Sequence, residues 1–308
     1  MRNYILLPLL ASHLALGNVF LTTNRWGGRF GDQLLLYTKA KALSYTFNIP
    51  YLYRPFHHST RLQLHHIEKQ CPDNKQFAKV VKIKKPSELQ KIVRKHHTKN
   101  ILCLVDYYAH INPFTMPDKF REQMRLLISP HAKPALPANI PEGAVTVAIH
   151  VRRGDCKPPH KSHTGLKCHN DRDYIKLLQS LINHLGKNGE EPDVYIHIFT
   201  DDPNPCAIAR KFKAAINKRN ITCVGTYCIE DSSETKSIEF GCNSSGNSQH
   251  LQAITHDFFN IASFDYLIRP YGSNFSIMSQ FVGTHRKILG VHDPTPENPE
   301  WIRTYCMK

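Results

Sequence analysis

The sequence predicts an α/β protein with a parallel sheet in each of two halves. Strand-like and helix-like segments alternate along the 308 residues, which is the order of parallel βαβ units. The run 145–151 is almost continuously apolar, as expected of a strand that is buried on both faces. A proline-rich stretch then indicates a linker between the halves. It carries Pro130, Pro134, Pro137 and Pro141.

The first half opens with a strand, a glycine-rich turn and a helix. The β-branched run 19–23 predicts the strand, and Gly27, Gly28 and Gly31 mark the turn. Apolar residues then recur on one helical face over 32–47. This unit is the usual opening of a doubly wound α/β domain. The helical face consists of Leu36, Ala40, Leu43 and Phe47.

The remaining segments continue the alternation. Apolar runs predict strands over 51–53, 101–105, 145–151, 194–200, 266–269 and 287–291. Helical spacing predicts helices over 171–185, 251–264 and 275–282, one through Ile208, Phe212 and Ile216, and one near the end of the basic stretch 82–99. The stretch 230–249 is rich in Ser, Asn and Gly and is expected to be a loop.

Four parts of the chain follow from this pattern. We expect a signal peptide over 1–17, an α/β domain over 18–130, a second α/β domain over 144–292 and a tail over 293–308. Arg2, the apolar run from Tyr4 to Leu16 and small residues ending at Gly17 are typical of a signal peptide. The run is shorter than the roughly 20 residues of a membrane span. The alternative is a buried first strand or helix.

Export would favour disulfide bonds among the nine cysteines. The candidates lie in loop-like stretches, and sequence alone does not give their connectivity. They are Cys156 and Cys168, and Cys223, Cys228 and Cys242. Cysteine and histidine spacings typical of a zinc site are absent from the sequence.

The net charge points to an anionic partner. There are 40 Lys and Arg residues against 25 Asp and Glu, which gives a formal charge of +15. Nucleotide phosphates, an anionic membrane surface and nucleic acid all fit this excess. The basic stretch 82–99 favours nucleic acid, but no zinc-finger spacing or RNP-type aromatic motif supports it. The ordinary composition indicates neither disorder nor a multi-pass membrane protein.

Three polar clusters follow predicted strands of the second half. HVRRGD at 150–155 ends the first strand, TDDP at 200–203 ends the next, and YGSNFS at 271–276 follows the strand 266–269. Open α/β sheets bind ligands outside the carboxyl ends of their strands. The three clusters therefore predict one site.

The residue types in these clusters suit a nucleoside diphosphate. Arg152 or Arg153 presents a fork of donors that matches phosphate oxygens, while the other would brace the turn. Gly154 lets the backbone come close. Hydroxyls of Ser273 and Ser276, with Asn274, precede a short helix whose free N–H groups favour an anion.

Each cluster also has an ordinary structural interpretation. The arginines could form surface salt bridges, and the segment at 273–276 could be a simple N-cap. Asp201 and Asp202 could accept hydrogen bonds from a ribose or base, or could be turn residues before Pro203. They are not the spaced acidic pair that metal-dependent transferases use, so no metal is predicted. The turn GGRFGDQ at 27–33 is not a GxGxxG fingerprint, and it could close over a ligand or be loop geometry alone.

The motifs resemble those of the α-1,2-fucosyltransferases. HVRRGD is similar to their His-x-Arg-Arg-Gly-Asp motif and to the related arginine motif of α-1,6- and protein O-fucosyltransferases. GGRFGDQ resembles their Gly-Gly-x-x-Gly-Asn-Gln turn, with Asp32 in place of the usual Asn, and FTDD at 199–202 resembles Phe-Ser-Asp-Asp. The segment 257–276 resembles their final block in altered form. The order is kept from about 19 to 291.

The resemblance implies a GT-B-like fold, with two Rossmann-like domains whose parallel sheets face a central cleft. The domain over 18–130 would be on the acceptor side, and that over 144–292 would bind the GDP-sugar. It implies transfer of fucose from GDP-fucose to a glycan hydroxyl, such as the 2-position of a galactoside, with inversion. It also implies no cofactor beyond this donor substrate and no essential metal.

Residue roles carry over from the same motifs. Arg152 would hold the β-phosphate and stabilise the leaving diphosphate, assisted by the segment 273–276. Asp155 and Asp32 are alternative candidates for the base on the acceptor hydroxyl. The predicted donor-binding residues are His150, Arg152, Arg153, Gly154, Gly28, Gly31, Asp201, Asp202, Asp257, Ser273, Asn274 and Ser276.

Two other functions remain open from sequence. One is a nonenzymatic, basic nucleic-acid-binding protein, and the other is a glycosyltransferase-fold protein that uses another nucleotide sugar or lacks catalysis. The main interpretation has a GDP-sugar and a glycan as partners and no nucleic acid. It places the protein in the secretory pathway, with membrane association only through the N-terminal segment; the alternative is the cytoplasm.

Overall fold

The computed structural model describes most of the chain in two compact units. It covers residues 19–24, 28–95, 99–106, 109–132, 137, 140–153, 168–186, 192–202, 204–216, 221–225, 248–293 and 296. The first unit holds the described parts of 1–26, 36–54 and 68–111, and the second holds those of 27–35, 55–67 and 112–308. The expected signal peptide over 1–17 lies outside the described residues. Among the described helices, none is long and apolar enough to span a membrane.

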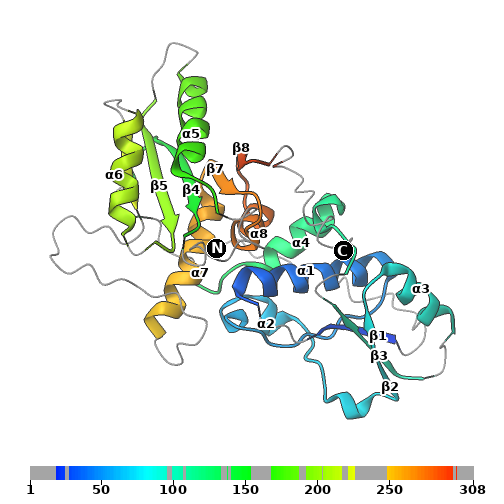
Figure 1. Ribbon diagram of the computed structural model, residues 1–308. Helices are drawn as coiled ribbons and strands as arrows, with labels where there is room; N and C mark the ends of the chain where they lie inside the picture. The colour runs from blue at the N-terminus through cyan, green and yellow to red at the C-terminus, as the bar shows by residue number, and fades with distance from the viewer. Residues whose placement is uncertain are drawn as a thin grey trace. The chain divides into compact units, whose positions relative to one another are not determined.

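The first unit contains a three-stranded parallel sheet in the order β1-β3-β2. Its strands are β1 (Val19–Thr23), β2 (Lys79–Ile83) and β3 (Ile101–Val105). The central strand β3 is buried along its whole length. The expected strand over 51–53 consists of two isolated bridges, one from Tyr51 to Leu21 and one from Tyr53 to Gln70. Helix α3 (Pro86–Lys95) follows the edge strand β2 (Figure 1).

Helix α1 (Phe30–Phe47) is buried around most of its circumference. Of the expected face, Leu36, Ala40 and Leu43 are fully buried and Phe47 is partly buried. Tyr37 and Lys39 on other faces are buried as well. The helix begins two residues earlier than expected. Its first residues, up to Leu35, belong to the second unit, and the rest belong to the first.

The second unit is built on a five-stranded parallel sheet in the order β6-β5-β4-β7-β8. Figure 1 labels β5, β4, β7 and β8. The strands are β4 (Val145–Val151), β5 (Val194–Thr200), β6 (Ile221–Gly225), β7 (Tyr266–Pro270) and β8 (Lys287–Val291). Helices α5 (Asp171–Leu185) and α6 (Pro205–Ile216) pack on the face that carries Ile149 and Val151. Helix α7 (Ser248–Ser263) packs on the opposite face with Ala148.

Three further α-helices are described in the second unit. They are α2 (Leu64–Ile67), α4 (Asp118–Ile128) and α8 (Asn274–Val282), and α8 packs against both α7 and α4. Helix α8 follows directly from β7 through the turn at Tyr271 and Gly272. Its start therefore lies at the carboxyl end of the sheet, where the sequence predicts the site.

The predicted fold class is confirmed, because all pairings in both sheets are parallel. The expectation that the sheets face a central cleft stays a prediction. The two compact units do not follow the predicted domain boundaries at 130 and 144. The described parts of 27–35, 55–67 and 112–130 group with the second unit. The predicted loop 230–249 lies outside the described residues except for 248–249, which begin α7.

One of the expected disulfide candidates is wrong. Cys223 is a free thiol in β6, since this segment is a strand and not a loop. Burial raises the pKa of Cys223 to about 12. Cys168 is disulfide-bonded as expected, and so is Cys206. The other candidates, Cys156, Cys228 and Cys242, lie outside the described residues.

Candidate functional site

The carboxyl end of β4 carries the first polar cluster. Side chains alternate along the strand, so Val151 faces the apolar core under α5 and α6, while His150 faces the side of α7 and α8. The His150 ring lies 5.6 Å from the ring of Phe275, measured between centroids. Arg152, two residues further on, is 9% exposed.

Arg153 binds protein groups on the other side of the sheet. Its backbone N–H donates to Asp201 Oδ1 at 2.5 Å, and its guanidinium donates to the His169 carbonyl at 2.7 Å and to the Asp171 carboxylate. Burial alone would raise the pKa of Asp171, but Lys211 and Arg153 lower it below its usual value. Arg153 thus ties the end of β4 to the end of β5 and the start of α5.

The second cluster is engaged mainly in turn contacts. Asp202 Oδ1 accepts the Asn204 N–H at 2.8 Å, and the Asp202 N–H donates to Thr200 Oγ1 at 3.1 Å. Asn204 Oδ1 in turn accepts the Ala207 N–H at the start of α6. These are Asx-type contacts that begin a helix. They fit the turn interpretation of Asp202, while Asp201 holds Arg153.

The third cluster forms the N-terminus of α8. The Ser273 carbonyl accepts the Ile277 N–H at 3.0 Å, so the helix begins at this point. The Ser276 hydroxyl donates to the same carbonyl at 3.4 Å. The first N–H groups of a helix have no intrahelical acceptor and favour an anion.

Two buried polar atoms beside this helix start have no hydrogen-bond partner in the part of the chain that the structure describes. They are Ser273 Oγ, on a residue that is 1% exposed, and His150 Nδ1. Ser273 is at the N-cap position but makes no side-chain cap. A buried polar atom without a partner costs about 1–3 kcal/mol. These atoms therefore mark a place where a polar ligand or water would bind.

The glycine turn of the first motif lies against this same helix start. Asn274 Nδ2 donates to Asp32 Oδ1, and a Cβ on Gly31 would lie 2.5 Å from the backbone nitrogen of Phe275. Phe258 of α7 packs between the rings of Phe30 and Phe275, at 5.2 and 5.6 Å. Gly28 contributes its carbonyl, which accepts from Gln33 Nε2 at 3.2 Å. The structure thus brings the first and the last motif together.

Burial shifts the pKa values of two groups, one on α7 and one at the end of β4. It raises the pKa of Asp257, on α7 beside Phe258, to about 8. It lowers the pKa of His150 to about 4; Asp201 opposes that shift and Arg269 adds to it. At neutral pH Asp257 is therefore protonated and His150 is uncharged, so both can act as neutral hydrogen-bonding groups.

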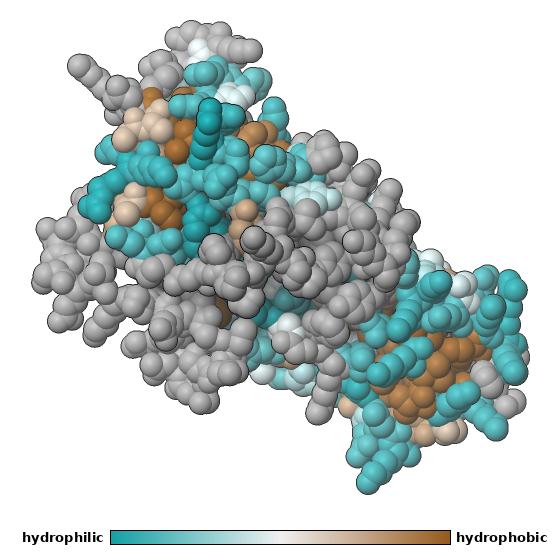
Figure 2. Space-filling model, in the orientation of Figure 1, coloured by the Kyte–Doolittle hydropathy of each residue, from teal (hydrophilic) through white to brown (hydrophobic). Residues whose placement is uncertain are grey.

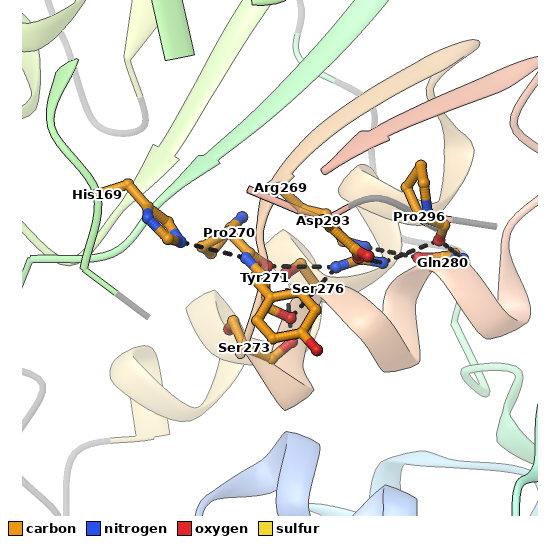
Figure 3. A network of polar contacts seen from close by, with 9 residues as sticks. All are labelled: His169, Arg269, Pro270, Tyr271, Ser273, Ser276, Gln280, Asp293 and Pro296. Atoms are coloured by element: carbon orange, nitrogen blue, oxygen red, sulfur yellow. Dashed lines mark hydrogen bonds and ion pairs between the residues drawn. The ribbon is translucent and has the colours of Figure 1, made fainter. Parts of the chain in front are cut away.

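Arg269, which lies outside the three predicted clusters, anchors the turn into α8 (Figure 3). It is fully buried and pairs with the buried Asp293 at 2.8 Å. Its other N–H groups donate to Gln280 Oε1 at 2.7 Å and to the carbonyls of Pro270, Tyr271 and Pro296. The sequence signal was an arginine inside an apolar strand, because a buried cation requires a carboxylate partner.

His169 supports the same turn from the side of α5. Its Nε2 accepts the Tyr271 N–H at 3.4 Å. Because the His169 carbonyl also binds Arg153, one residue connects the first cluster to the third.

Two of the predicted site residues, Gly154 and Asp155, lie outside the described residues. Of the rest, His150, Ser273, Asn274 and Ser276 lie around the start of α8 with Gly31 and Asp32. Among the described residues, no three His, Cys, Asp or Glu side chains gather closely enough to hold a metal ion.

Comparisons with known proteins give no match by sequence and a similarity by structure. The chain matches no protein-family model and no curated protein. A mutant of Arabidopsis thaliana FUT1 in complex with GDP is similar with a TM-score of 0.48 at 9% identity, over 92% of this chain and 72% of that chain. POFUT1 in complex with GDP-fucose gives 0.48 at 9% identity, over 92% and 99%.

The NodZ alpha-1,6-fucosyltransferase soaked with GDP-fucose is similar with a TM-score of 0.43 at 10% identity, over 87% of this chain and 93% of that chain. All three TM-scores are below 0.5. The function proposed below therefore rests on the site and its motifs.

Proposed function

We propose that this chain is a GT-B-like fucosyltransferase that transfers fucose from GDP-fucose to a hydroxyl of a glycan acceptor, with inversion and without an essential metal. The observation that carries the proposal is the convergence of the motifs at the start of α8. There the unpartnered atoms Ser273 Oγ and His150 Nδ1 lie with a helix N-terminus and the glycine turn.

The diphosphate would bind at the helix start, with Arg152 as its main counter-charge. Backbone N–H groups of residues 274–276 and the Ser273 hydroxyl are donors suited to phosphate oxygens. Arg153 is held by Asp171 and His169, which fits the bracing role, and the motif resemblance assigns the phosphate to Arg152. Gly154 would let the turn approach the phosphates.

The nucleoside would bind beside α7 and the end of β5. A protonated Asp257 can donate one hydrogen bond and accept another, and on ionising it can accept two from a guanine edge. His150 and Asp201 are further candidates for ribose or base contacts, together with Asp202 if its turn contact leaves one oxygen available. The neutral imidazole of His150 suits a hydroxyl or amide partner.

In the proposed reaction the acceptor oxygen attacks C1 of fucose while the bond from C1 to the β-phosphate oxygen breaks. GDP leaves with the electron pair, and a base takes the proton of the acceptor hydroxyl. Arg152 would stabilise the charge that develops on the leaving diphosphate. Asp32 already accepts hydrogen bonds from Asn274 and from the Arg29 N–H, which favours Asp155 as the base.

The finer parts of the proposal follow from the motif resemblance. The acceptor would be a galactoside modified at the 2-position, bound on the side of the domain over 18–130. Arg152 would supply the charge that a metal supplies in other transferases, so transfer should persist in excess chelator. The signal peptide over 1–17 would direct the chain to a secretory compartment, and it offers the only membrane association that we propose.

A thermal-shift panel of GDP, UDP, CMP and ADP tests the donor class. At 100 times its dissociation constant, a ligand stabilises the folded state by about 2.7 kcal/mol, so GDP should raise the melting temperature most. The variant Ser273→Ala should lose part of the GDP shift. Ser263→Ala is the control, because this serine on α7 donates within its own helix to the Asn260 carbonyl. A shift with UDP and none with GDP would show that the donor is a different nucleotide sugar.

A further inference from the structure

The first unit carries a dense group of cations that the proposed donor site does not use. Nine basic residues fall within 75–99, against one acidic residue, Glu88. All nine are exposed. They are Lys75, Lys79, Lys82, Lys84, Lys85, Lys91, Arg94, Lys95 and Lys99, and we call them the basic surface.

The basic surface has no counter-charge in the described structure. None of its side chains forms an ion pair with a described residue, whereas cations elsewhere pair, as Lys41 does with Glu68. The Glu88 carboxylate accepts the backbone N–H groups of Lys84 and Lys85 at 2.9 and 3.3 Å. The one acid in the segment is therefore committed to the start of α3.

Protection of a sheet edge explains only part of this surface. Strand β2 is at the edge of its sheet, and lysines on an edge prevent pairing with other chains. That accounts for Lys79 and Lys82. It does not account for Lys91, Arg94 and Lys95, which lie on α3. On the visible face of the first unit, hydrophilic residues surround a hydrophobic area (Figure 2). Like charges gathered in this way attract an extended anion.

The chemistry of the surface favours a glycan polyanion over nucleic acid or a membrane. Stacking on bases needs exposed aromatic rings, but Phe77 packs on Phe20 at 5.8 Å and is half-buried. Membrane insertion needs an apolar face, and Val80, 38% exposed, is the one exposed large hydrophobic residue in the described part of 75–99. Eight of the nine cations are lysines, which act as point charges without the bidentate fork of arginine.

We propose that the basic surface binds a polyanionic glycan, a chain that bears sulfate or uronate groups, and that the acceptor belongs to this class. This inference rests on the proposed function for its link to catalysis. Charge attraction along the chain would hold the acceptor on the first unit and would contribute to KM more than to kcat. Binding to the surface itself does not depend on the donor site.

Binding of dextran sulfate tests the surface, with neutral dextran as the reference. A surface variant removes four charges from the basic surface, through Lys82→Gln, Lys91→Gln, Arg94→Gln and Lys95→Gln. A matched control removes four exposed charges from the second unit, with Lys119→Gln, Arg172→Gln, Lys176→Gln and Lys287→Gln. By analogy with phosphate contacts, each lost contact should lower the slope of log affinity against log salt by roughly 0.9.

We expect dextran sulfate to bind the wild type and the matched control similarly, and the surface variant at least tenfold more weakly. The GDP-induced thermal shift should be the same in all three proteins. In transfer assays the surface variant should raise KM for a sulfated acceptor and leave kcat unchanged. An absence of any transfer would count against the proposed function, while the binding comparison would still decide the surface.

Two outcomes would overturn the inference. One is equal binding of dextran sulfate by the surface variant and the matched control. The other is tighter binding of single-stranded RNA or of anionic lipid vesicles than of dextran sulfate, lost in the same variant. That second outcome would assign the surface to a nucleic acid or a membrane.

Discussion

Asp32 on α1 accepts a hydrogen bond through Oδ1 from Asn274 Nδ2 at the start of α8. Its other oxygen accepts the backbone N–H of Arg29 at 3.1 Å, as the third residue of a helix does in a capping box. One carboxylate thus caps α1 and links its first turn, which belongs to the second unit, to the helix start that we propose as the phosphate site. We infer that Asp32 positions α8 and does not act as the catalytic base.

The contact between the two helix starts leaves no room for a side chain at Gly31. A Cβ there would lie 2.5 Å from Phe275 N and 2.7 Å from Asn274 C. Gly31→Ala should therefore displace the start of α8, destabilise the fold by about 1–3 kcal/mol and abolish the GDP-induced thermal shift. Urea unfolding and the nucleotide panel measure both effects.

The control for this variant is Gly186→Ala at the end of α5, where the backbone φ of −85° suits any residue. It should change neither stability nor GDP binding by a measurable amount. A Gly31→Ala protein that binds GDP normally would contradict the assignment of the α8 start to the ligand.

Substitutions of the two arginines after β4 should have different effects on transfer rate and on stability. Arg152→Ala should lower the transfer rate by roughly a hundred- to thousandfold at nearly unchanged melting temperature, because one donor to the leaving group costs about 2.7–4 kcal/mol. Arg152→Lys should restore only part of the rate, because lysine lacks the forked geometry. Arg153→Ala should cost stability, by about 1–3 kcal/mol, and less rate. The same loss of rate and stability in both alanine variants would refute this division.

The buried pair of Arg269 and Asp293 should dominate the stability of the turn into α8. Both side chains are fully buried and 2.8 Å apart. Removing one partner of such a pair costs about 3–5 kcal/mol, because the other charge stays buried. Asp293→Asn should therefore lower the unfolding free energy far more than Asp173→Asn, because Asp173 on α5 pairs, among the described residues, with the exposed His292. Chemical denaturation measures the unfolding free energy of both variants. Equal losses would contradict the stabilising role of the pair of Arg269 and Asp293.

Asp257 should make the fold less stable as pH rises. Burial raises its pKa from 3.8 to about 8, so the folded state keeps a proton that the unfolded chain has released. Between these two values the wild type should lose roughly 1.4 kcal/mol per pH unit relative to Asp257→Asn. Above about pH 8 the difference should stay constant. Urea unfolding of both proteins from pH 5 to 9 measures it, and parallel pH curves would show that the carboxyl is not buried as a neutral group.

Much of the second sheet could be predicted, because its strands β4 and β5 are seven-residue, largely apolar runs. The strands that escaped prediction are short and carry polar residues. Strand β2 exposes Lys79 and Lys82 at an edge, so it lacks the apolar run of a central strand. Helix α4 did have a signal, since Phe120, Met124 and Leu127 recur at helical spacing and are buried.

The site was predictable where topology alone sets it. Parallel strands bring their carboxyl ends to one edge, so the segments after β4, β5 and β7 had to lie near each other. The link from Asp32 to Asn274 was not predictable, because 242 residues separate them and no pattern encodes their contact. The pair of Arg269 and Asp293 likewise depends on β7 lying next to β8, and that order is a property of the folded sheet.

Because Asp32 and Asn274 are 242 residues apart, the order of synthesis constrains how the second unit matures. The turn at 28–33 leaves the ribosome early, but the backbone of Phe275 that it packs against is made much later. At about 5–20 residues per second, the delay is roughly 10 to 50 s. During that interval the apolar ring of Phe30 has neither Phe258 nor Phe275 to cover it. We therefore expect this ring to stay exposed on the nascent chain until Phe258 and Phe275 have been made.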